Sequence, residues 1–198
     1  MIVIGLTGPS GSGKGWVSSI LNKYNIPTID TDAVYHDLLI PPSPCLSELV
    51  DAFGSTILTD NKLNRPALAA IVFADSEKLK LLNHITHKYI LEKTDSLLQQ
   101  YEKDGYQAAT VDAPALFESG YDKKCDFVIA VTAPKELRLQ RILHRDSISV
   151  DNALNRLSAQ PDDEFYSSRA KYTVCNNNDD VQLIKDLCAI LEQEGITI

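Results

Sequence analysis

The stretch "GPSGSGKGW", residues 8–16, constrains this chain more than any other. It follows a short apolar run, residues 2–7, and it opens a segment, residues 15–24, whose apolar positions recur at helical spacing. Between a buried strand and a helix, glycines let backbone N–H groups close around phosphate oxygens, and the helix N-terminus adds a favourable dipole. The stretch therefore predicts a phosphate-binding loop. An ordinary glycine-rich turn is the alternative.

The loop departs from the usual pattern G-x-x-x-x-G-K-[ST] at one position, because Gly15 stands where a hydroxyl normally contacts magnesium. Lys14 is in place to reach the β- and γ-phosphates of a nucleotide. The "GKG" sequence resembles that of adenylate kinases and their relatives, which implies a metal held largely through water and phosphates. We predict a working nucleotide site with an altered metal shell, and a disabled site is the alternative. The predicted nucleotide contacts come from Gly8, Gly11, Ser12, Gly13, Lys14, Gly15 and Trp16.

Composition limits the partners of the chain. With 198 residues it is long enough for one domain with a full core. Its 19 basic and 27 acidic residues give a net charge of -8, which disfavours general binding of nucleic acid. Its 4 cysteines lack metal-site spacing and are expected to be free thiols. No apolar run approaches membrane-spanning length, so we expect a cytoplasmic protein with no membrane contact. We also expect a monomer.

Apolar runs with strand character alternate with helical patterns along much of the chain, which predicts an α/β fold with a parallel sheet. Two helical stretches interrupt this alternation. Residues 33–94 show no convincing strand, and their longest helix is expected from about residue 76 to 101. Residues 135–170 are helical and rich in arginine. We expect strands within residues 2–7, 26–30, 106–114, 125–134 and 172–176, and a closing helix over residues 179–195.

Acidic residues follow two of the predicted strands, at the edge of the sheet where ligands bind in such folds. Asp32 is a candidate to take the proton of an acceptor hydroxyl or to order magnesium-bound water, with Asp30 a weaker candidate. The alternative for Asp32 is a helix N-cap. Asp112 could contribute to the outer shell of the metal. The alternative, equally favoured, is that Asp112 is a structural cap.

Arginines recur on the predicted helix that begins at residue 135, since Arg138, Arg141 and Arg145 stand three and four residues apart. This face suits a lid that closes over a triphosphate, and a solvated surface is the alternative. His84 and His87 share one helix, but two histidines without a third ligand are poor evidence for zinc. His87 is expected to face a cleft, with a core or surface position as the alternative.

These motifs, taken in their order along the chain, resemble the dephospho-CoA kinase family. The resemblance covers nearly the whole chain and includes "IGLTGPSGSGK", "IPTIDTD", "VDAPALFESG", "QRILHRD", "RLSAQ" and "AKYTVCNNND". It implies a P-loop kinase fold, a three-layer α/β/α arrangement with a five-stranded parallel sheet. The implied core is residues 1–32, 95–134 and 171–198, with a substrate-binding insertion at 33–94 and a lid at 135–170. The resemblance assigns catalysis to Asp32, Lys14 and Arg141, nucleotide contacts also to Arg145 and Asn176, and substrate contacts to Asp32, Arg65, His87, Pro114, Leu116 and Glu118.

The activity implied by the resemblance is ATP-dependent phosphorylation of the ribose 3′-hydroxyl of dephospho-CoA, with ATP as co-substrate and Mg²⁺ held mainly by ATP and water near Asp32 and Asp112. The chain departs from the family pattern at Gly15, Lys88, Ala115 and Lys171. The alternatives are a nucleoside or nucleotide monophosphate kinase and a non-catalytic nucleotide-binding switch. Aromatic residues of the insertion could line a groove for the pantetheine arm or form its core; these are Tyr35, Phe53, Phe73 and Tyr89.

Overall fold

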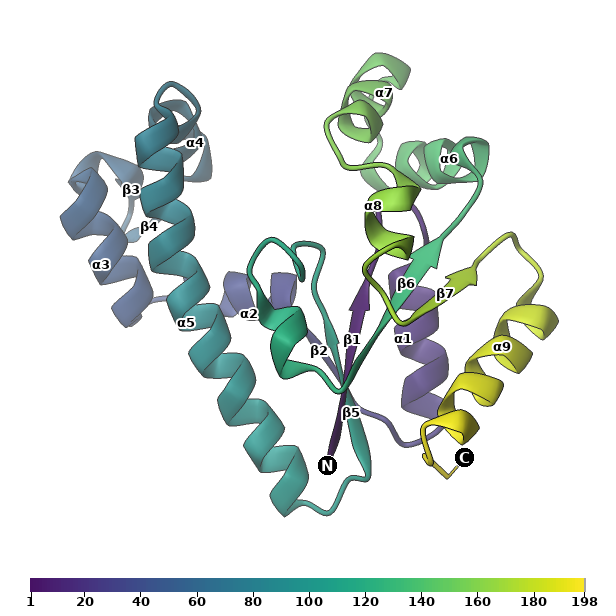
Figure 1. Ribbon diagram of the computed structural model, residues 1–198. Coiled ribbons are helices and arrows are strands. Elements are labelled where there is room, and N and C mark those ends of the chain that lie inside the picture. The colour runs from purple at the N-terminus through teal and green to yellow at the C-terminus, as the bar shows by residue number, and fades with distance from the viewer. Residues whose placement is uncertain (198) are drawn as a thin grey trace. The chain divides into compact units, whose positions relative to one another are not determined.

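The computed structural model describes residues 1–197, and the chain divides into two compact units (Figure 1). The first unit comprises residues 1–29 and 100–198, and the second comprises residues 30–99. The second unit is thus an insertion between two strands of the first. Each unit is described by itself below.

A five-stranded sheet forms the centre of the first unit, with the strand order β2-β5-β1-β6-β7. The pairs β1–β5, β1–β6 and β6–β7 are parallel. The inner strands are buried along almost their whole length, as expected of a parallel sheet covered by helices. Every strand predicted for this sheet is confirmed, and the strands are β1 (Ile2–Thr7), β2 (Thr28–Asp30), β5 (Ala108–Asp112), β6 (Phe127–Thr132) and β7 (Tyr172–Cys175).

Two helices, α1 (Lys14–Lys23) and α9 (Asp180–Gln193), cover one face of this sheet (Figure 1). Their apolar residues meet strand residues such as Leu6 and Ile129 in one buried cluster. Burial of each large aliphatic side chain contributes about 1.5–3 kcal/mol to the free energy of folding. The N-terminal end of α1, which begins directly after the loop, is therefore anchored by the core.

Three further α-helices of the first unit come from residues 135–170, the predicted lid. They are α6 (Lys135–Asp146), α7 (Val150–Ser158) and α8 (Asp163–Ser167). Ile142 of α6 packs on Ala153 and Leu157 of α7 in a small core of their own. A short helix, η2 (Tyr121–Lys124), precedes β6.

The second unit is built mainly from helices around its own apolar cluster, which includes Leu49, Ile57, Leu68, Val72 and Ile85. The predicted long helix is confirmed and continues into the first unit. The helices are α2 (Thr31–Asp37), α3 (Pro44–Phe53), η1 (Ser55–Ile57), α4 (Arg65–Phe73) and α5 (Ser76–Lys103).

The expectation that this insertion has no strand is wrong in one detail. A two-stranded antiparallel hairpin joins β3 (Leu58–Thr59) to β4 (Lys62–Leu63). Asp60 and Asn61 form its turn with φ angles of 51° and 61°, as the twist of a two-residue hairpin requires. Strands of two residues are too short to produce an alternating pattern, so the sequence gives no periodic signal for them.

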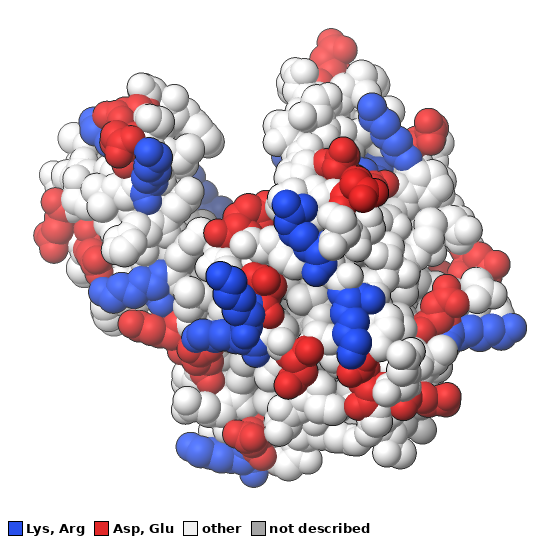
Figure 2. Space-filling model, viewed as in Figure 1, with Lys and Arg blue, Asp and Glu red and all other residues white. Residues whose placement is uncertain are grey.

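Among the described residues, no helix combines the length and apolar composition that crossing a membrane requires. The face shown in Figure 2 carries acidic and basic side chains interspersed over it, without a continuous basic surface.

Candidate active site

The loop between β1 and α1 has the backbone of a phosphate-binding loop. Gly8, Gly11 and Gly13 all have positive φ angles, of 142°, 79° and 92°. At Gly13 a Cβ atom would lie 2.1 Å from Nδ2 of Asn176, so both the conformation and the space exclude a side chain. Gly8, Gly11 and Gly13 are thus required by the geometry of the loop.

Backbone donors of this loop remain available for a ligand. Within the described part of the chain, the N–H groups of Gly11, Gly13, Lys14 and Gly15 donate to no protein acceptor. They stand at the start of α1, where the helix dipole favours an anion, and no side chain caps this helix. The ammonium of Lys14 lies 3.2 Å from the carbonyl oxygen of Gly8 and so bridges the loop. The arrangement offers a cation and converging N–H groups to a polyphosphate.

Arg141 of α6 holds the outer side of the same loop. Its Nη1 donates to the carbonyl oxygens of Gly11 and Ser12, each at 3.2 Å. Its Nη2 donates to the backbone and side-chain oxygens of Asn176, at 3.1 and 3.0 Å, and to Oδ1 of Asn178 at 2.7 Å. By accepting these bonds the loop carbonyls point toward Arg141. The structure therefore gives this predicted catalytic arginine a role in ordering the loop.

The arginine face of α6 does not act as one surface. Arg138 is buried, with 6% of its surface exposed, and contacts the loop. Arg145 is largely exposed and pairs with the neighbouring Asp146, with 2.7 Å between Nε and Oδ1. The pKa of Asp146 is lowered by hydrogen bonding from Arg145 and by the nearby charge of Arg156. Periodicity alone did not separate these environments.

Trp16 and Asn176, two further predicted nucleotide contacts, lie beside the loop. The indole Nε1 of Trp16 donates to Oδ1 of Asp180 at 2.9 Å, and 42% of its surface is exposed. The ammonium of Lys23 lies 5.5 Å from the centre of the indole ring. Asn176 is buried, and its N–H donates to the carbonyl oxygen of Thr132 at the end of β6, at 2.8 Å. The indole is thus tied to the start of α9, and Asn176 is fixed at the end of β6.

The residues proposed near magnesium are Gly15, Asp112 and the second-unit Asp32. A Cβ at Gly15 would have no heavy atom within 4 Å, so this position is open. Asp112 ends β5 and is nearly buried, at 9% exposure, and its Oδ2 accepts a hydrogen bond from Ser18 at 3.4 Å. No group of three His, Cys, Asp or Glu residues with the spacing of a metal site exists among residues 1–197.

The turn after β5 contains the predicted substrate residues Pro114, Leu116 and Glu118. The carbonyl oxygen of Pro114 accepts a hydrogen bond from Thr7 Oγ1 at 3.4 Å. Leu116 is fully buried, and a Cβ at Gly5 would lie 2.8 Å from its side chain. Glu118 is exposed. Leu116 therefore supports the turn from the sheet, while Glu118 is accessible to a ligand.

In the second unit, the N-cap of α2 is Asp30 rather than Asp32. The Oδ1 of Asp30 accepts hydrogen bonds from the N–H groups of Asp32 and Ala33, at 2.9 and 3.2 Å. The alternative interpretation of Asp32 as the cap is therefore wrong, because the residue two positions earlier fills that place. Asp32 lies in the first turn of α2 with an exposed side chain.

Arg65 and His87, the other predicted substrate residues of this unit, lie on α4 and α5. Arg65 Nη2 contacts Nδ1 of His36, a contact that sequence reasoning did not identify. Burial lowers the pKa of His87, which is half-buried, and this favours its neutral form.

Lys88, which departs from the family pattern, forms an ion pair with Glu48, with 3.2 Å between Nζ and Oε2. The hydroxyl of Tyr89 donates to the same carboxylate at 2.6 Å.

The central strand of the parallel sheet leads through a glycine loop into a helix, and the loop carries a lysine and free N–H groups. This combination defines a P-loop α/β protein of the nucleotide-kinase type. Comparison with known proteins gives the particular family. The family model described as dephospho-CoA kinase matches residues 2–182, and the chain belongs to this family.

Individual relatives agree with this assignment. A dephospho-CoA kinase from Corynebacterium efficiens is 39% identical over 178 residues, which cover 89% of each chain. Among solved structures, TT1252 from Thermus thermophilus has a TM-score of 0.82 at 29% identity and covers 97% of both chains. A dephospho-CoA kinase from Campylobacter jejuni has a TM-score of 0.69 at 28% identity, covering 96% of both chains.

Proposed function

We propose that this protein transfers the γ-phosphoryl group of ATP to the ribose 3′-hydroxyl of dephospho-CoA, giving coenzyme A and ADP. The observation that carries the proposal is the phosphate loop, with Lys14 and unpaired N–H groups at the start of α1, in a chain that belongs to the dephospho-CoA kinase family. We place the reaction in the cytoplasm and expect a monomer. Nucleic acid is not expected as a partner, because the net charge of -8 disfavours it.

On the nucleotide side, the loop N–H groups and Lys14 hold the β- and γ-phosphates and stabilise the charge that develops as the γ-phosphoryl group is transferred. Arg141 keeps the loop carbonyls turned away from the phosphates. Arg145 is exposed and supplies a further positive charge to the triphosphate. Trp16 and Asn176 contact the adenine base of ATP.

On the acceptor side, the 3′-oxygen attacks the γ-phosphorus while the bond from that phosphorus to the β–γ bridging oxygen breaks. Both electrons of that bond leave with ADP. Asp32 takes or orients the proton of the 3′-hydroxyl, as its exposed carboxylate permits. Arg65 and His87, with Pro114, Leu116 and Glu118, form the proposed set for the rest of the substrate.

The residues present fit magnesium that arrives with ATP. Gly15 offers no hydroxyl, and oxygen donors stand at the end of β5, where the carboxylate of Asp112 accepts from the hydroxyl of Ser18 on α1. Magnesium keeps several waters and binds through few carboxylates, so this donor set suits an outer-shell role. When bound, the ion neutralises charge on the phosphate oxygens.

The test is incubation of the purified protein with ATP, magnesium and dephospho-CoA, followed by mass detection of coenzyme A and of ADP. Nucleosides and nucleoside monophosphates serve as competing acceptors, and the Lys14→Ala variant serves as the inactive control. Formation of coenzyme A by the native protein alone supports the proposal. Phosphorylation of a nucleoside or nucleotide in preference to dephospho-CoA, or ATP binding without turnover of any acceptor, contradicts it.

A further inference from the structure

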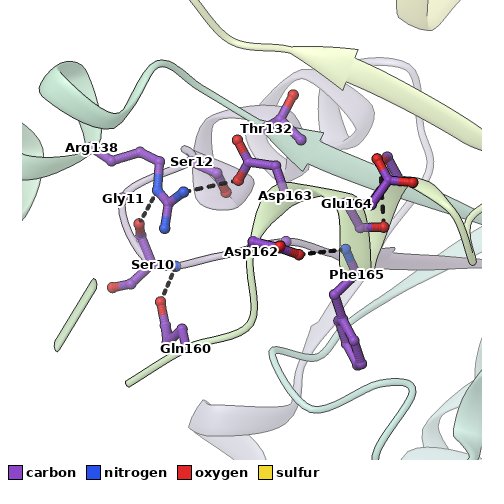
Figure 3. A network of polar contacts seen from close by, with 12 residues as sticks. Ser10, Gly11, Ser12, Thr132, Arg138, Gln160, Asp162, Asp163, Glu164 and Phe165 are labelled. Atoms are coloured by element: carbon purple, nitrogen blue, oxygen red, sulfur yellow. Dashed lines mark hydrogen bonds and ion pairs between the residues drawn. The ribbon is translucent and has the colours of Figure 1, made fainter. Parts of the chain in front are cut away.

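Both backbone groups of Ser10, in the middle of the phosphate loop, are bound by side chains from distant parts of the first unit (Figure 3). Its N–H donates to Oε1 of Gln160 at 2.8 Å, and its carbonyl oxygen accepts from Nε of Arg138 at 3.1 Å. Gln160 lies in the linker between α7 and α8, and Arg138 lies on α6. We call Gln160, Arg138 and Asp163 the Ser10 clamp.

Asp163 completes the clamp by fixing Arg138. Nη1 of Arg138 pairs with Oδ1 of Asp163 at 2.9 Å, with 8% of the arginine side chain and 48% of the aspartate side chain exposed. A guanidinium donates in a rigid planar fork, so a bond at one nitrogen sets the direction of the others. Figure 3 shows this guanidinium between Ser10 and Asp163. The first residue of α8 therefore orients the donor that holds the loop carbonyl.

The turn that contains Ser10 is also restricted from its other sides. The N–H of Ser12 donates to the carbonyl oxygen of Pro9 at 3.2 Å and closes the turn. A Cβ at Gly11 would lie 2.6 Å from the carbonyl oxygen of Arg138, so the backbone of α6 packs directly against the loop. Rotation of the peptide groups of Ser10 would break the clamp, and the surrounding backbone leaves little space for another arrangement.

We infer that Gln160 is a positioning residue for phosphoryl transfer, acting with Arg138 and Asp163 by holding Ser10 and with it the phosphate loop. This inference rests on the proposed function. Ser10 lies two residues after Gly8, whose carbonyl oxygen contacts the Lys14 ammonium that reaches the β- and γ-phosphates in loops of this type. A loop displaced by a fraction of an ångström loses alignment with the reacting phosphate, which costs rate more than binding.

The choice of glutamine also fits this role. An amide oxygen accepts the Ser10 N–H without placing a negative charge beside the bound phosphates. Glutamate has the same length and accepts the same bond, but its charge would repel a triphosphate. Methionine has similar length and no comparable acceptor. These two replacements at Gln160 separate the hydrogen bond from the charge.

The experiment first compares backbone hydrogen exchange of the loop peptide, without substrate, in the native protein, Gln160→Met and Gln160→Glu. We expect exchange of the loop about tenfold faster in Gln160→Met, because the acceptor is lost, and near-native exchange in Gln160→Glu. In turnover, Gln160→Met is expected to lower kcat about tenfold with an unchanged KM for dephospho-CoA. Gln160→Glu is expected to keep more of kcat and to raise the KM for ATP.

Gln107→Met is the matched control. Gln107 accepts from the N–H of Thr197 at 3.2 Å and donates to the carbonyl oxygen of Gly195 at 3.0 Å. It precedes β5 at the edge of the sheet where β1 begins, whereas the loop follows the end of β1. This variant also loses a glutamine that binds backbone groups, so a purely structural effect would appear in it equally. We expect its kcat to remain native.

Native loop exchange in Gln160→Met, or a kcat equal to that of Gln107→Met, overturns the inference. If Gln160→Met does not fold, Asp163→Ala takes its place, because it releases Arg138 from a half-exposed partner, and the same loss of kcat is expected in milder form. Failure of the proposed function gives a different result. The native protein then makes no coenzyme A, while the exchange comparison still shows whether the clamp holds the loop.

Discussion

The phosphate loop of the first unit and the candidate substrate residues of the second unit are built in different ways. Backbone groups form most of the loop, from Gly8 to Gly15, and side chains of α6 and of the linker between α7 and α8 hold it. In the second unit, Asp32 and Arg65 are exposed side chains on separate helices. A cap at Asp30 supports the turn with Asp32, and His36 contacts Arg65.

This difference has a consequence for substitutions. A site made from backbone N–H groups depends on the glycines that set its conformation and on the residues packed against it. It tolerates few changes at those positions but does not depend on most other side chains. A site made from exposed side chains depends on each of them singly. We therefore expect variants of the two regions to separate nucleotide binding from acceptor chemistry.

The largest effect is expected at Lys14, whose side chain we propose contacts the β- and γ-phosphates. Lys14→Ala removes the charge that faces the β- and γ-phosphates, and turnover should fall by orders of magnitude. Its ammonium donates to the carbonyl oxygen of Gly8 in the loop and does not enter the apolar core, so cooperative unfolding should be retained. Lys185→Ala, at an exposed position of α9, is the control. Near-native turnover in Lys14→Ala would contradict the site.

Asp32→Asn tests the second region. The loss of a proton acceptor is expected to reduce kcat by about a hundredfold, while binding of ATP survives. Asp30→Asn is a matched control, because asparagine caps a helix as well as aspartate does, so α2 should remain intact. Stopped-flow binding and steady-state rates distinguish the two roles. Loss of ATP binding in Asp32→Asn, with native turnover of the complex that forms, would make Asp32 a metal or structural residue.

Arg141 and Arg145 test whether the loop depends on its support from α6. Arg141→Ala leaves the carbonyl oxygens of Gly11, Ser12 and Asn176 without their donor. The expected result is a fall in stability of about 1–3 kcal/mol together with weaker nucleotide binding. Arg145→Ala, which loses an exposed pair with Asp146, should lower turnover with little change in Tm. Equal stability of both variants would show that Arg141 does not order the loop.

The sheet and the loop could be predicted from sequence because local patterns determine them. Apolar runs identify buried strands, and the positive φ angles of Gly8, Gly11 and Gly13 account for the glycine spacing. The Ser10 clamp and the Arg141 network could not be predicted, since they join residues far apart in the chain and depend on side-chain direction. The roles of Arg65, His87 and Glu118 stay predictions, because they rest on the family resemblance rather than on a local pattern.

A smaller effect is expected from the titration of His87. Burial holds the pKa of this imidazole below its ordinary value of about 6.5. The unfolded chain therefore binds a proton at a higher pH than the folded protein does. Stability is retained above about pH 6.5 and falls as the pH drops through the lower folded pKa. Melting temperatures between about pH 7.5 and 5 should fall less steeply in His87→Gln than in the native protein, with exposed His84→Gln as control. Parallel curves would contradict this contribution.

The smallest effect is expected at Gly15, and it addresses the backbone character of the loop most directly. No heavy atom lies within 4 Å of a Cβ placed there, so Gly15→Ser fits without displacing a neighbour. Serine also has a helix propensity better than that of glycine by a few tenths of a kcal/mol. Its hydroxyl stands where loops of this type contact magnesium, so the variant should remain active with an equal or lower magnesium requirement.

Gly15→Ala is the matched control for this substitution, because alanine gains at least as much helix propensity over glycine as serine does, about 1 kcal/mol, without a hydroxyl. Magnesium titrations of turnover at fixed ATP compare all three proteins. A lower magnesium requirement in the serine variant alone assigns the effect to metal coordination. An equal shift in the alanine variant assigns it to the helix instead. If the native protein is inactive at every magnesium concentration and only the serine variant turns over, then Gly15 disables the site and the proposed activity is wrong for this chain.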